Sequence, residues 1–161
     1  MKHLILAFSL MQANLCGAQL VQQASPEQLI EKLTPPAPAT RSLRNLTPKP
    51  VTVDLSIQFD FDSANLQAVS KPLLDNLALA MNSERLAALQ FRVEGHTDAK
   101  GKADYNLQLS NRRAQAVVDY LSQAHVAPTR LQASGKGATE LLISERPMAS
   151  ENRRVRITVL P

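Results

Sequence analysis

The stretch that most constrains the fold covers residues 95–113, GHTDAKGKADYNLQLSNRR. An alternation of apolar and polar residues ends at Asp98, and the helical pattern that follows contains Arg113. Between them, Gly101 tolerates backbone angles that other residues avoid, and Asp104 is suited to be a helix N-cap. The chain is therefore expected to turn sharply after Asp98 and return beside it, which brings an acid and a base to one crevice.

An aspartate and an arginine that flank one crevice suit a ligand with both charges. The carboxylate of Asp98 can accept hydrogen bonds from an ammonium group, and the guanidinium of Arg113 can hold a carboxylate in two places. The alternative is that the two side chains form an ion pair with each other. The residue types alone favour neither interpretation.

Hydrophobic periodicity predicts one domain of the α+β class over residues 51–161. Strict alternation indicates half-buried strands at 51–59 and 89–96, and helical spacing indicates a helix from Ser70, with Pro72 in its first turn. Because a helix connects the two strands, we expect them to run parallel. Further expected elements are a helix at 104–124, a strand at 131–134, a turn at 135–137 and a last strand at 153–160.

Ligands of open sheets bind at the carboxyl ends of the strands, and this rule places Phe61 and Asp98 at one edge. On the second helix, Asn106, Leu109 and Arg113 are three and four positions apart and share a face. The core-facing stripe of this helix is predicted to contain Leu107, Ala114, Val117 and Leu121, whereas Arg112 is expected to be solvated.

Four short motifs follow one another along the domain: FDFD at 59–62, GHTD at 95–98, YNLQLSNRRA at 105–114 and NRRV at 152–155. Together they resemble the motifs of the OmpA-like peptidoglycan-binding domain, the C-terminal domain of OmpA and MotB. The resemblance implies a βαβαββ sandwich whose mixed four-stranded sheet packs against helices. It also implies a non-catalytic domain that binds the diaminopimelate residue of a peptidoglycan stem peptide.

By this resemblance, Asp98 receives the ammonium group of the ligand and Arg113 its carboxylate. The other candidate contacts are Asn106, Leu109, Thr97, Phe61 and Asp62. Phe61 has an alternative place in the core. For Arg153, which either reaches the crevice or caps the sheet, we favour the cap.

Residues 1–18 have the pattern of a secretory signal peptide: Lys2 and His3, an apolar stretch at 4–11, and small residues around a cleavage site after Ala18. The apolar stretch is shorter than the roughly 20 residues that span a bilayer, so no transmembrane span is expected in the mature chain. The predicted location is the periplasm or the outer membrane. The alternative is a mature chain that begins at a lipidated Cys16, although Leu15 is an unusual neighbour for such a site.

Residues 19–50 are predicted to form a short helix and a proline-rich linker. The sequence SPEQ at 25–28 is typical of a helix start, and prolines recur throughout 34–50. We therefore expect residues 19–50 to be poorly ordered and a chain that begins near Thr47 to fold as well as the mature one.

The sequence does not predict an enzyme, a cofactor or a metal site. Outside the signal, only His96 and His125 remain as histidines, without an HExxH motif, and neither GxSxG nor a cysteine nucleophile is present. Nucleic acid is excluded as a partner because the formal charge is only +4 and aromatic residues make up 4% of the chain, with no tryptophan.

Two functions remain in the sequence interpretation. The first is a periplasmic anchor that binds peptidoglycan and so ties the outer membrane or an envelope complex to the cell wall. The second is an accessory subunit of an envelope machine, of stator or secretion type, with the same domain. Outer-membrane or other envelope proteins are further expected partners.

Overall fold

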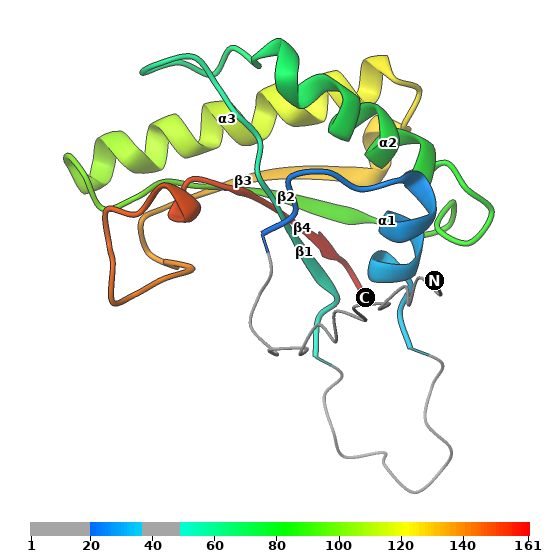
Figure 1. The fold of residues 1–161 in the computed structure, drawn as a ribbon. Coiled ribbons are helices and arrows are strands. Elements are labelled where there is room, and N and C mark those ends of the chain that lie inside the picture. Colours follow the sequence, from blue (N-terminus) through cyan, green and yellow to red (C-terminus); the bar gives the residue numbers. More distant parts are fainter. Residues whose placement is uncertain (1–19, 37–48) are drawn as a thin grey trace, which may run out of the picture.

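The last strand of the chain lies in the interior of the sheet. The computed structural model describes residues 20–36 and 49–161. Its four strands are β1 (Thr52–Leu55), β2 (Phe91–His96), β3 (Leu131–Gly137) and β4 (Val155–Val159), and their spatial order is β1-β4-β2-β3. β4 is antiparallel to both neighbours and β2 is parallel to β3 (Figure 1). The predicted α+β class with a mixed four-stranded sheet is confirmed, and β1 and β2 share a direction with β4 between them.

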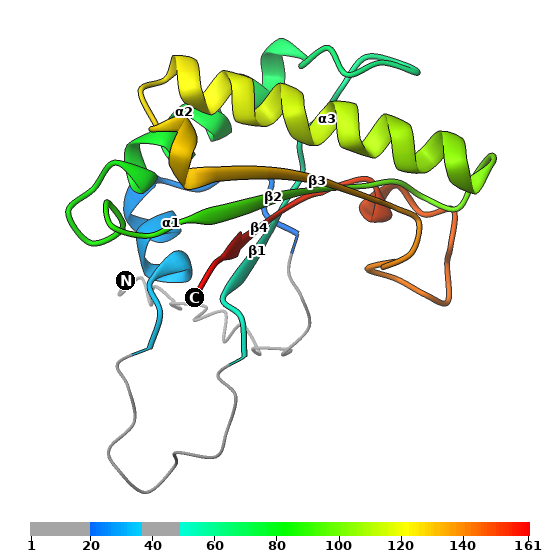
Figure 2. The same cartoon turned by 180° about the vertical axis from the view of Figure 1, so that it is seen from behind.

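Two helices, α2 (Lys71–Met81) and α3 (Ala103–Gln123), cover one face of this sheet (Figures 1 and 2). The strands turn alternate apolar side chains toward them, among which Phe91, Val93 and Ile157 are fully buried. Pro72 lies in the first turn of α2, as predicted. In the described residues, short 3₁₀ turns lie at Ala68–Ser70, Pro128–Arg130 and Ser150–Asn152. No helix in the described parts of the chain is both long and apolar enough to cross a bilayer.

Helix α3 lies unusually close to β2 and β3 because two glycines face it. Gly95 and Gly135 are partners in the β2–β3 register. A Cβ atom on Gly95 would lie only 2.2 Å from the carbonyl oxygen of Ser110, and one on Gly135 only 2.4 Å from the backbone nitrogen of Asn111. The backbone N–H of Gly135 donates to Asn111 Oδ1 at 2.6 Å, and that of Gly137 donates to Ser110 Oγ at 2.9 Å. These contacts fix the position of α3 along the strands.

The segment before the domain joins the fold. The N–H of Val21 donates to the carbonyl of Asp54 at 2.8 Å, and the N–H of Ser56 donates to the carbonyl of Val21 at 2.8 Å. Helix α1 (Pro26–Leu33) packs against α2 and buries Leu29 and Leu33 completely. This segment is therefore part of the hydrophobic core, and Val21 pairs with Leu55 at the edge of the sheet that β1 forms.

The predicted short helix is confirmed, and its start has the capping box that the SPEQ sequence indicates. The prediction of poor order is wrong for residues 20–36, because the apolar face of α1 is buried against α2. The signal peptide at 1–18, which includes Cys16, and residues 37–48 of the proline-rich stretch lie outside the described residues.

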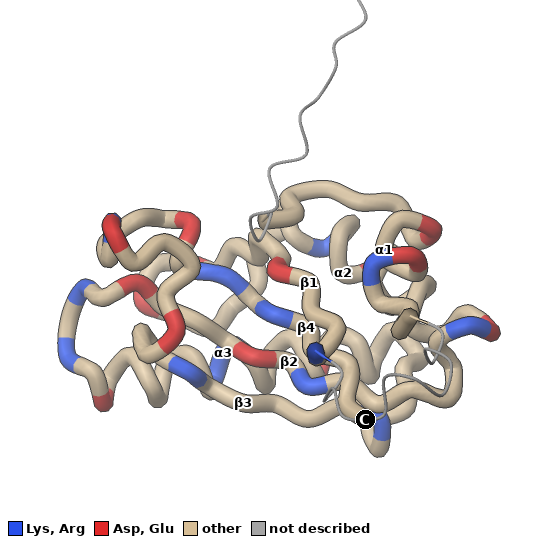
Figure 3. The backbone as a smooth tube through the Cα atoms, turned by 90° about the horizontal axis from the view of Figure 1, so that it is seen from below, with Lys and Arg blue, Asp and Glu red and all other residues tan. Residues whose placement is uncertain are grey.

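The face of the sheet away from α2 and α3 carries a row of charges (Figure 3). Asp54 on β1 is opposite Arg156 on β4, and Arg156 is opposite Glu94 on β2. Asp54 Oδ1 accepts from Arg154 Nε at 2.8 Å and from Arg156 Nε at 2.9 Å. Burial alone would raise the pKa of Asp54, but these arginines hold it below its ordinary value. We call Asp54, Arg154 and Arg156 the buried cluster.

Several local predictions are wrong. The first strand ends at Leu55 rather than Phe59, because the backbone then pairs with Val21 instead of β4. Residues 135–137 continue β3 beside β2 and do not form a turn. The N-cap of α3 is Lys102, not Asp104, and Leu107 is exposed because the inner stripe passes through Ser110 and Ala114.

Candidate functional site

Asp98 lies directly after β2, in a loop that α3 holds in place. Asn106 Nδ2 donates to the carbonyls of Asp98 at 3.3 Å and Lys100 at 3.0 Å, and Gly101 has a φ of 95°, which favours glycine. The N–H of Lys100 donates to Asp98 Oδ1 at 3.1 Å. The other oxygen, Oδ2, accepts from Arg153 Nη1 at 2.7 Å. Both carboxylate oxygens of Asp98 therefore have a partner.

Arg113 is positioned by the loop that follows β1. Its Nε donates to the carbonyl of Ser63 at 2.9 Å, and its guanidinium carbon lies 4.9 Å from the centre of the Phe59 ring. Burial lowers the pKa of Arg113, and the positive charge of Arg153 lowers it further. The group remains a cation at any physiological pH because an arginine starts from a very high pKa. Its guanidinium is thus oriented by one hydrogen bond and one aromatic ring.

Arg113 and Arg153 line the same cleft, which has a volume of about 330 Å³. Its walls come from the segment after β1 (Ser56 to Phe59), from the turn before β4 (Ser150 and Glu151) and from Leu20 and Gln22 of the N-terminal segment. Asp98 is joined to this cleft through its ion pair with Arg153. We call Asp98, Arg113 and Arg153 the exposed cluster.

The alternative in which Asp98 pairs with Arg113 does not occur: within the described chain, the ion-pair partner of Asp98 is Arg153. The preference for Arg153 as a cap of the sheet is therefore wrong. The topology explains this position. β4 is antiparallel to β1 and β2, so the residue that precedes β4 lies at the edge where β1 and β2 end.

The other predicted contacts occupy several environments. Thr97, Asn106 and Leu109 are buried, whereas the side chain of Phe61 is 98% exposed at the tip of the loop after β1. Asp62, in the same loop, accepts a hydrogen bond from the hydroxyl of Tyr105 on α3. The structure thus brings Asp98 and Arg113 to one edge, surrounds them with buried supports, and leaves Phe61 in solvent.

Sequence reasoning missed Phe59 and the two N-terminal cleft residues, Leu20 and Gln22, and for Arg153 it favoured the wrong one of two positions. Phe59 is the last apolar residue of the first alternation. Its position at the predicted strand end could have indicated a place beside the crevice. Arg153 could have been found by placing the last strand antiparallel within the sheet. Leu20 and Gln22 line the cleft, but nothing in the sequence around them indicates this position.

His96 and Thr97 form a buried polar pair behind Asp98. Neither ring nitrogen of His96 nor Thr97 Oγ1 has a hydrogen-bond partner among the described residues. Burial lowers the pKa of His96 to about 4, with a smaller contribution from the charges of Arg154 and Arg156. His96 is therefore neutral at pH 7. The described residues contain no group of three His, Cys, Asp or Glu side chains arranged to hold a metal ion.

The exposed cluster can bind both signs of charge. Two guanidinium groups offer a carboxylate several charge-assisted hydrogen bonds, and a carboxylate beside them can accept from an ammonium. The side chain of Arg153 is 49% exposed, so it can turn to water when a ligand cation takes its place on Asp98, and no buried charge is left unpaired.

Sequence comparison identifies relatives of this domain. The family model described as "OmpA family" matches residues 58–155. The chain is 35% identical over 107 residues to outer membrane protein A of Bordetella avium and 35% identical over 117 residues to a peptidoglycan-associated lipoprotein of Mesorhizobium japonicum. These matches cover 63% and 68% of this chain, but only 53% and 65% of the relatives.

Solved structures share the fold. The peptidoglycan-associated lipoprotein of Burkholderia pseudomallei matches with a TM-score of 0.56 and 29% identity, over 65% of this chain and 88% of that one. The OmpA-like domain of FopA1 from Francisella tularensis matches with a TM-score of 0.59 and 25% identity, over 73% and 78%. The cell wall anchor of the T6SS from Pseudomonas aeruginosa matches with a TM-score of 0.51 and 33% identity, over 63% and 73%.

Proposed function

The chain belongs to the OmpA family, and on that premise we propose that it binds peptidoglycan, without catalysis, through the diaminopimelate residue of a stem peptide. The observation that carries the proposal is the exposed cluster, in which Asp98 and two guanidinium groups meet at one edge of the sheet. The diaminopimelate side chain ends in an ammonium and a carboxylate on one carbon. It therefore offers this edge one charge of each sign.

Binding exchanges one ion pair for two. The ammonium of the ligand takes the place of Arg153 on Asp98 Oδ2, while Oδ1 keeps its bond to the N–H of Lys100. The carboxylate of the ligand goes to Arg113, whose guanidinium is already held by Ser63 and Phe59. Arg153, released from Asp98, remains at the cleft as a second cation for that carboxylate. A guanidinium that is held in place before binding loses less freedom when it binds.

The other predicted residues have supporting positions in this proposal. Asn106 acts through the loop, because its amide holds the carbonyls on both sides of the turn after Asp98. Thr97 and Leu109 are buried beneath the loop and shape it from inside. Phe61 and Asp62 lie at the exposed rim, where Phe61 has a free face for a ligand.

The role of this binding is to anchor the outer membrane or an envelope complex to the cell wall from the periplasm or the outer membrane. The sequence relatives named peptidoglycan-associated lipoprotein support an anchor. The likeness to the T6SS cell wall anchor supports a second candidate, an accessory subunit of a secretion-type envelope assembly. Both candidates use the same binding site.

Co-sedimentation with purified sacculi tests the proposal. Asp98→Ala and Arg113→Ala should each lose about 2 to 5 kcal/mol of binding free energy, since each leaves a ligand charge unpaired. At about 1.4 kcal/mol per tenfold, the loss is at least about thirtyfold. Arg112→Ala is the matched control, because Arg112 is exposed and adjacent in sequence, and it should keep most of the binding. Retained binding by both Asp98→Ala and Arg113→Ala would overturn the proposed site.

A further inference from the structure

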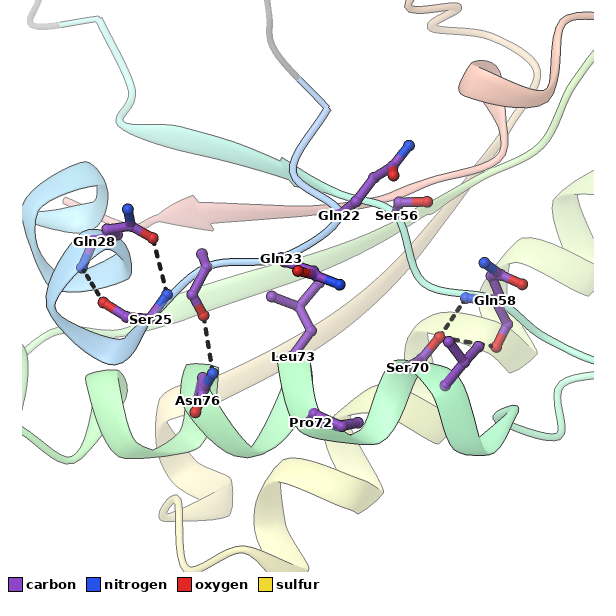
Figure 4. Close-up of a pocket in the computed structure, with 12 residues that line it drawn as sticks. Gln22, Gln23, Ser25, Gln28, Ser56, Gln58, Ser70, Pro72, Leu73 and Asn76 are labelled. Atoms are coloured by element: carbon purple, nitrogen blue, oxygen red, sulfur yellow. Dashed lines mark hydrogen bonds between the residues drawn. The ribbon is translucent and has the colours of Figure 1, made fainter.

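A second hollow continues the cleft along the molecule. It lies between residues 22–28 and the start of α2, and its volume is about 920 Å³ (Figure 4). It shares Gln22, Ser56 and Gln58 with the cleft that contains Arg113 and Arg153. Small-molecule sites typically have about 300 to 1,000 Å³, so the hollow is large enough for a ligand of its own. We call it the groove.

Among the described residues, none that lines the groove is charged, although 20% of the chain is charged. Most of the lining side chains end in an amide or a hydroxyl group. Within the described residues, the side chains of Gln22, Gln23 and Gln58 make no hydrogen bond to the protein. Each glutamine amide offers two donors and one acceptor oxygen. The groove therefore presents unused donors and acceptors without net charge.

Other polar groups of the groove hold its walls in place. Asn76 Nδ2 donates to the carbonyl of Ala24 at 2.9 Å, and Ser70 Oγ accepts from the N–H of Gln58 at 2.7 Å (Figure 4). The first bond ties α2 to the N-terminal segment, and the second ties the N-cap residue of α2 to the segment after β1. The backbone segments that carry the glutamines are thus held in place before a ligand binds. This lowers the entropic cost of ordering these segments on binding.

Small apolar surfaces lie among the amides. Val69, whose side chain is 65% exposed, and Pro72 and Leu73 line the floor beside α2. A ligand that fits this lining is uncharged, carries hydroxyl and amide groups, and has apolar faces. A stretch of peptide with free carboxylates does not fit, because the described lining offers no cation to pair with them.

We infer that the groove binds the N-acetylated sugar strand of the peptidoglycan whose stem peptide occupies the cleft, an inference that rests on the proposed function. N-acetyl sugars have the required chemistry: hydroxyl groups, a neutral amide and apolar ring faces. The continuity of the two hollows also fits the connectivity of this ligand. In a stem peptide, diaminopimelate is the third residue from the sugar, and three residues extend on the order of 10 Å.

Calorimetric titration with three ligands tests the inference: a diaminopimelate tripeptide, the same tripeptide attached to its disaccharide, and an N-acetylglucosamine oligosaccharide. Wild-type protein should bind the sugar-bearing tripeptide about tenfold more tightly than the tripeptide alone, because one or two hydrogen bonds contribute about this factor. Gln23→Ala should remove most of this gain and leave the affinity for the tripeptide unchanged. Gln132→Ala, at the opposite edge of the sheet, is the matched control and should keep the gain.

The outcomes separate the two proposals. Equal affinity of the wild-type protein for both peptide ligands would overturn the groove inference and leave the proposed function intact. Binding of the oligosaccharide without binding of the tripeptide would overturn the proposed function and leave the groove as a sugar site. A loss in Gln132→Ala equal to that in Gln23→Ala would also overturn the inference. Val69→Lys provides a second test, since it places a charge in the groove at an exposed position and should abolish the gain.

Discussion

Two clusters of aspartate and arginine lie a short distance apart on this molecule and differ mainly in their access to water. In the buried cluster, the side chains of Asp54 and Arg154 are 4% and 0% exposed. In the exposed cluster, those of Asp98 and Arg153 are 13% and 49% exposed. Arg153 and Arg154 are adjacent in one motif, yet Arg153 lines the cleft and pairs with Asp98, whereas Arg154 is buried and pairs with Asp54.

The difference shows which ion pair is available to a ligand. Breaking a buried pair costs about 3 to 5 kcal/mol, because the remaining charge stays without a partner or water. An exposed pair contributes only about 0 to 1 kcal/mol, so exchange with a ligand of the same chemistry is inexpensive. We therefore assign a structural role to the buried cluster and a binding role to the exposed cluster.

The largest predicted effect concerns the segment that supports β1, the strand of Asp54. A chain that begins at residue 49 lacks Leu29 and Leu33, both fully buried. Truncation of one core leucine costs about 2 to 5 kcal/mol. Without both leucines, the free energy of unfolding should therefore fall by at least about 4 kcal/mol. This reverses the expectation from the sequence. Chemical denaturation against a chain that begins at residue 20 measures the difference.

A substitution control accompanies that deletion. Leu29→Ala combined with Leu33→Ala should reproduce most of the loss, whereas Leu79→Ala, at an exposed position of α2, should change stability little. Equal unfolding midpoints for the chains that begin at 20 and 49 would show that the N-terminal segment is dispensable.

The next effect separates the two clusters directly. Asp54→Ala should lower the free energy of unfolding by about 3 to 5 kcal/mol, because it leaves Arg154 buried without its carboxylate. Arg153→Ala, which breaks the corresponding pair of the exposed cluster, should change it by about 0 to 1 kcal/mol. Thermal and chemical unfolding of both variants gives the comparison. Similar losses in the two variants would mean that water access does not distinguish the clusters.

A smaller effect tests the polar environment of His96, which lies near the buried cluster. Its pKa falls from 6.5 to about 4 in the folded protein. Between about pH 4 and pH 6.5, His96 is therefore protonated in the unfolded chain and neutral in the folded one. Stability is therefore lost as the pH drops from 6.5 toward 4. At about 1.4 kcal/mol per pH unit, the loss reaches roughly 3 kcal/mol. His96→Leu should unfold with a weaker pH dependence over this range, and an unchanged dependence would contradict the assignment.

The sequence predicted the elements whose signals are local. The apolar spacing of Leu73, Leu74, Leu77 and Met81 predicted α2, and all four side chains are buried. The placement of Asp98 after a strand and of Arg113 on the next helix followed from alternation and helical periodicity. These patterns depend only on neighbours along the chain, so one sequence is sufficient to read them.

The parts that the sequence did not predict depend on distant pairing. Asp54 is one of the polar residues in the alternation of the first strand, but its burial requires β4 to lie beside β1, a contact across about a hundred residues. The same strand order brings Arg153 to Asp98. The pairing of Val21 with Leu55 likewise has no signal in either segment. Sheet order, rather than element identity, was the missing information.

The most direct test of the central claim compares two stem tripeptides that differ in one carboxylate. Diaminopimelate and lysine present the same ammonium to Asp98, but only diaminopimelate presents a carboxylate to Arg113. Hydrogen bonds to charged groups contribute about 1.5 to 3 kcal/mol, so calorimetry should find the diaminopimelate peptide bound at least about tenfold more tightly. Arg113→Ala should remove most of this preference, because only Arg153 then remains for the carboxylate. Equal affinities of the wild-type protein for the two peptides would contradict the account.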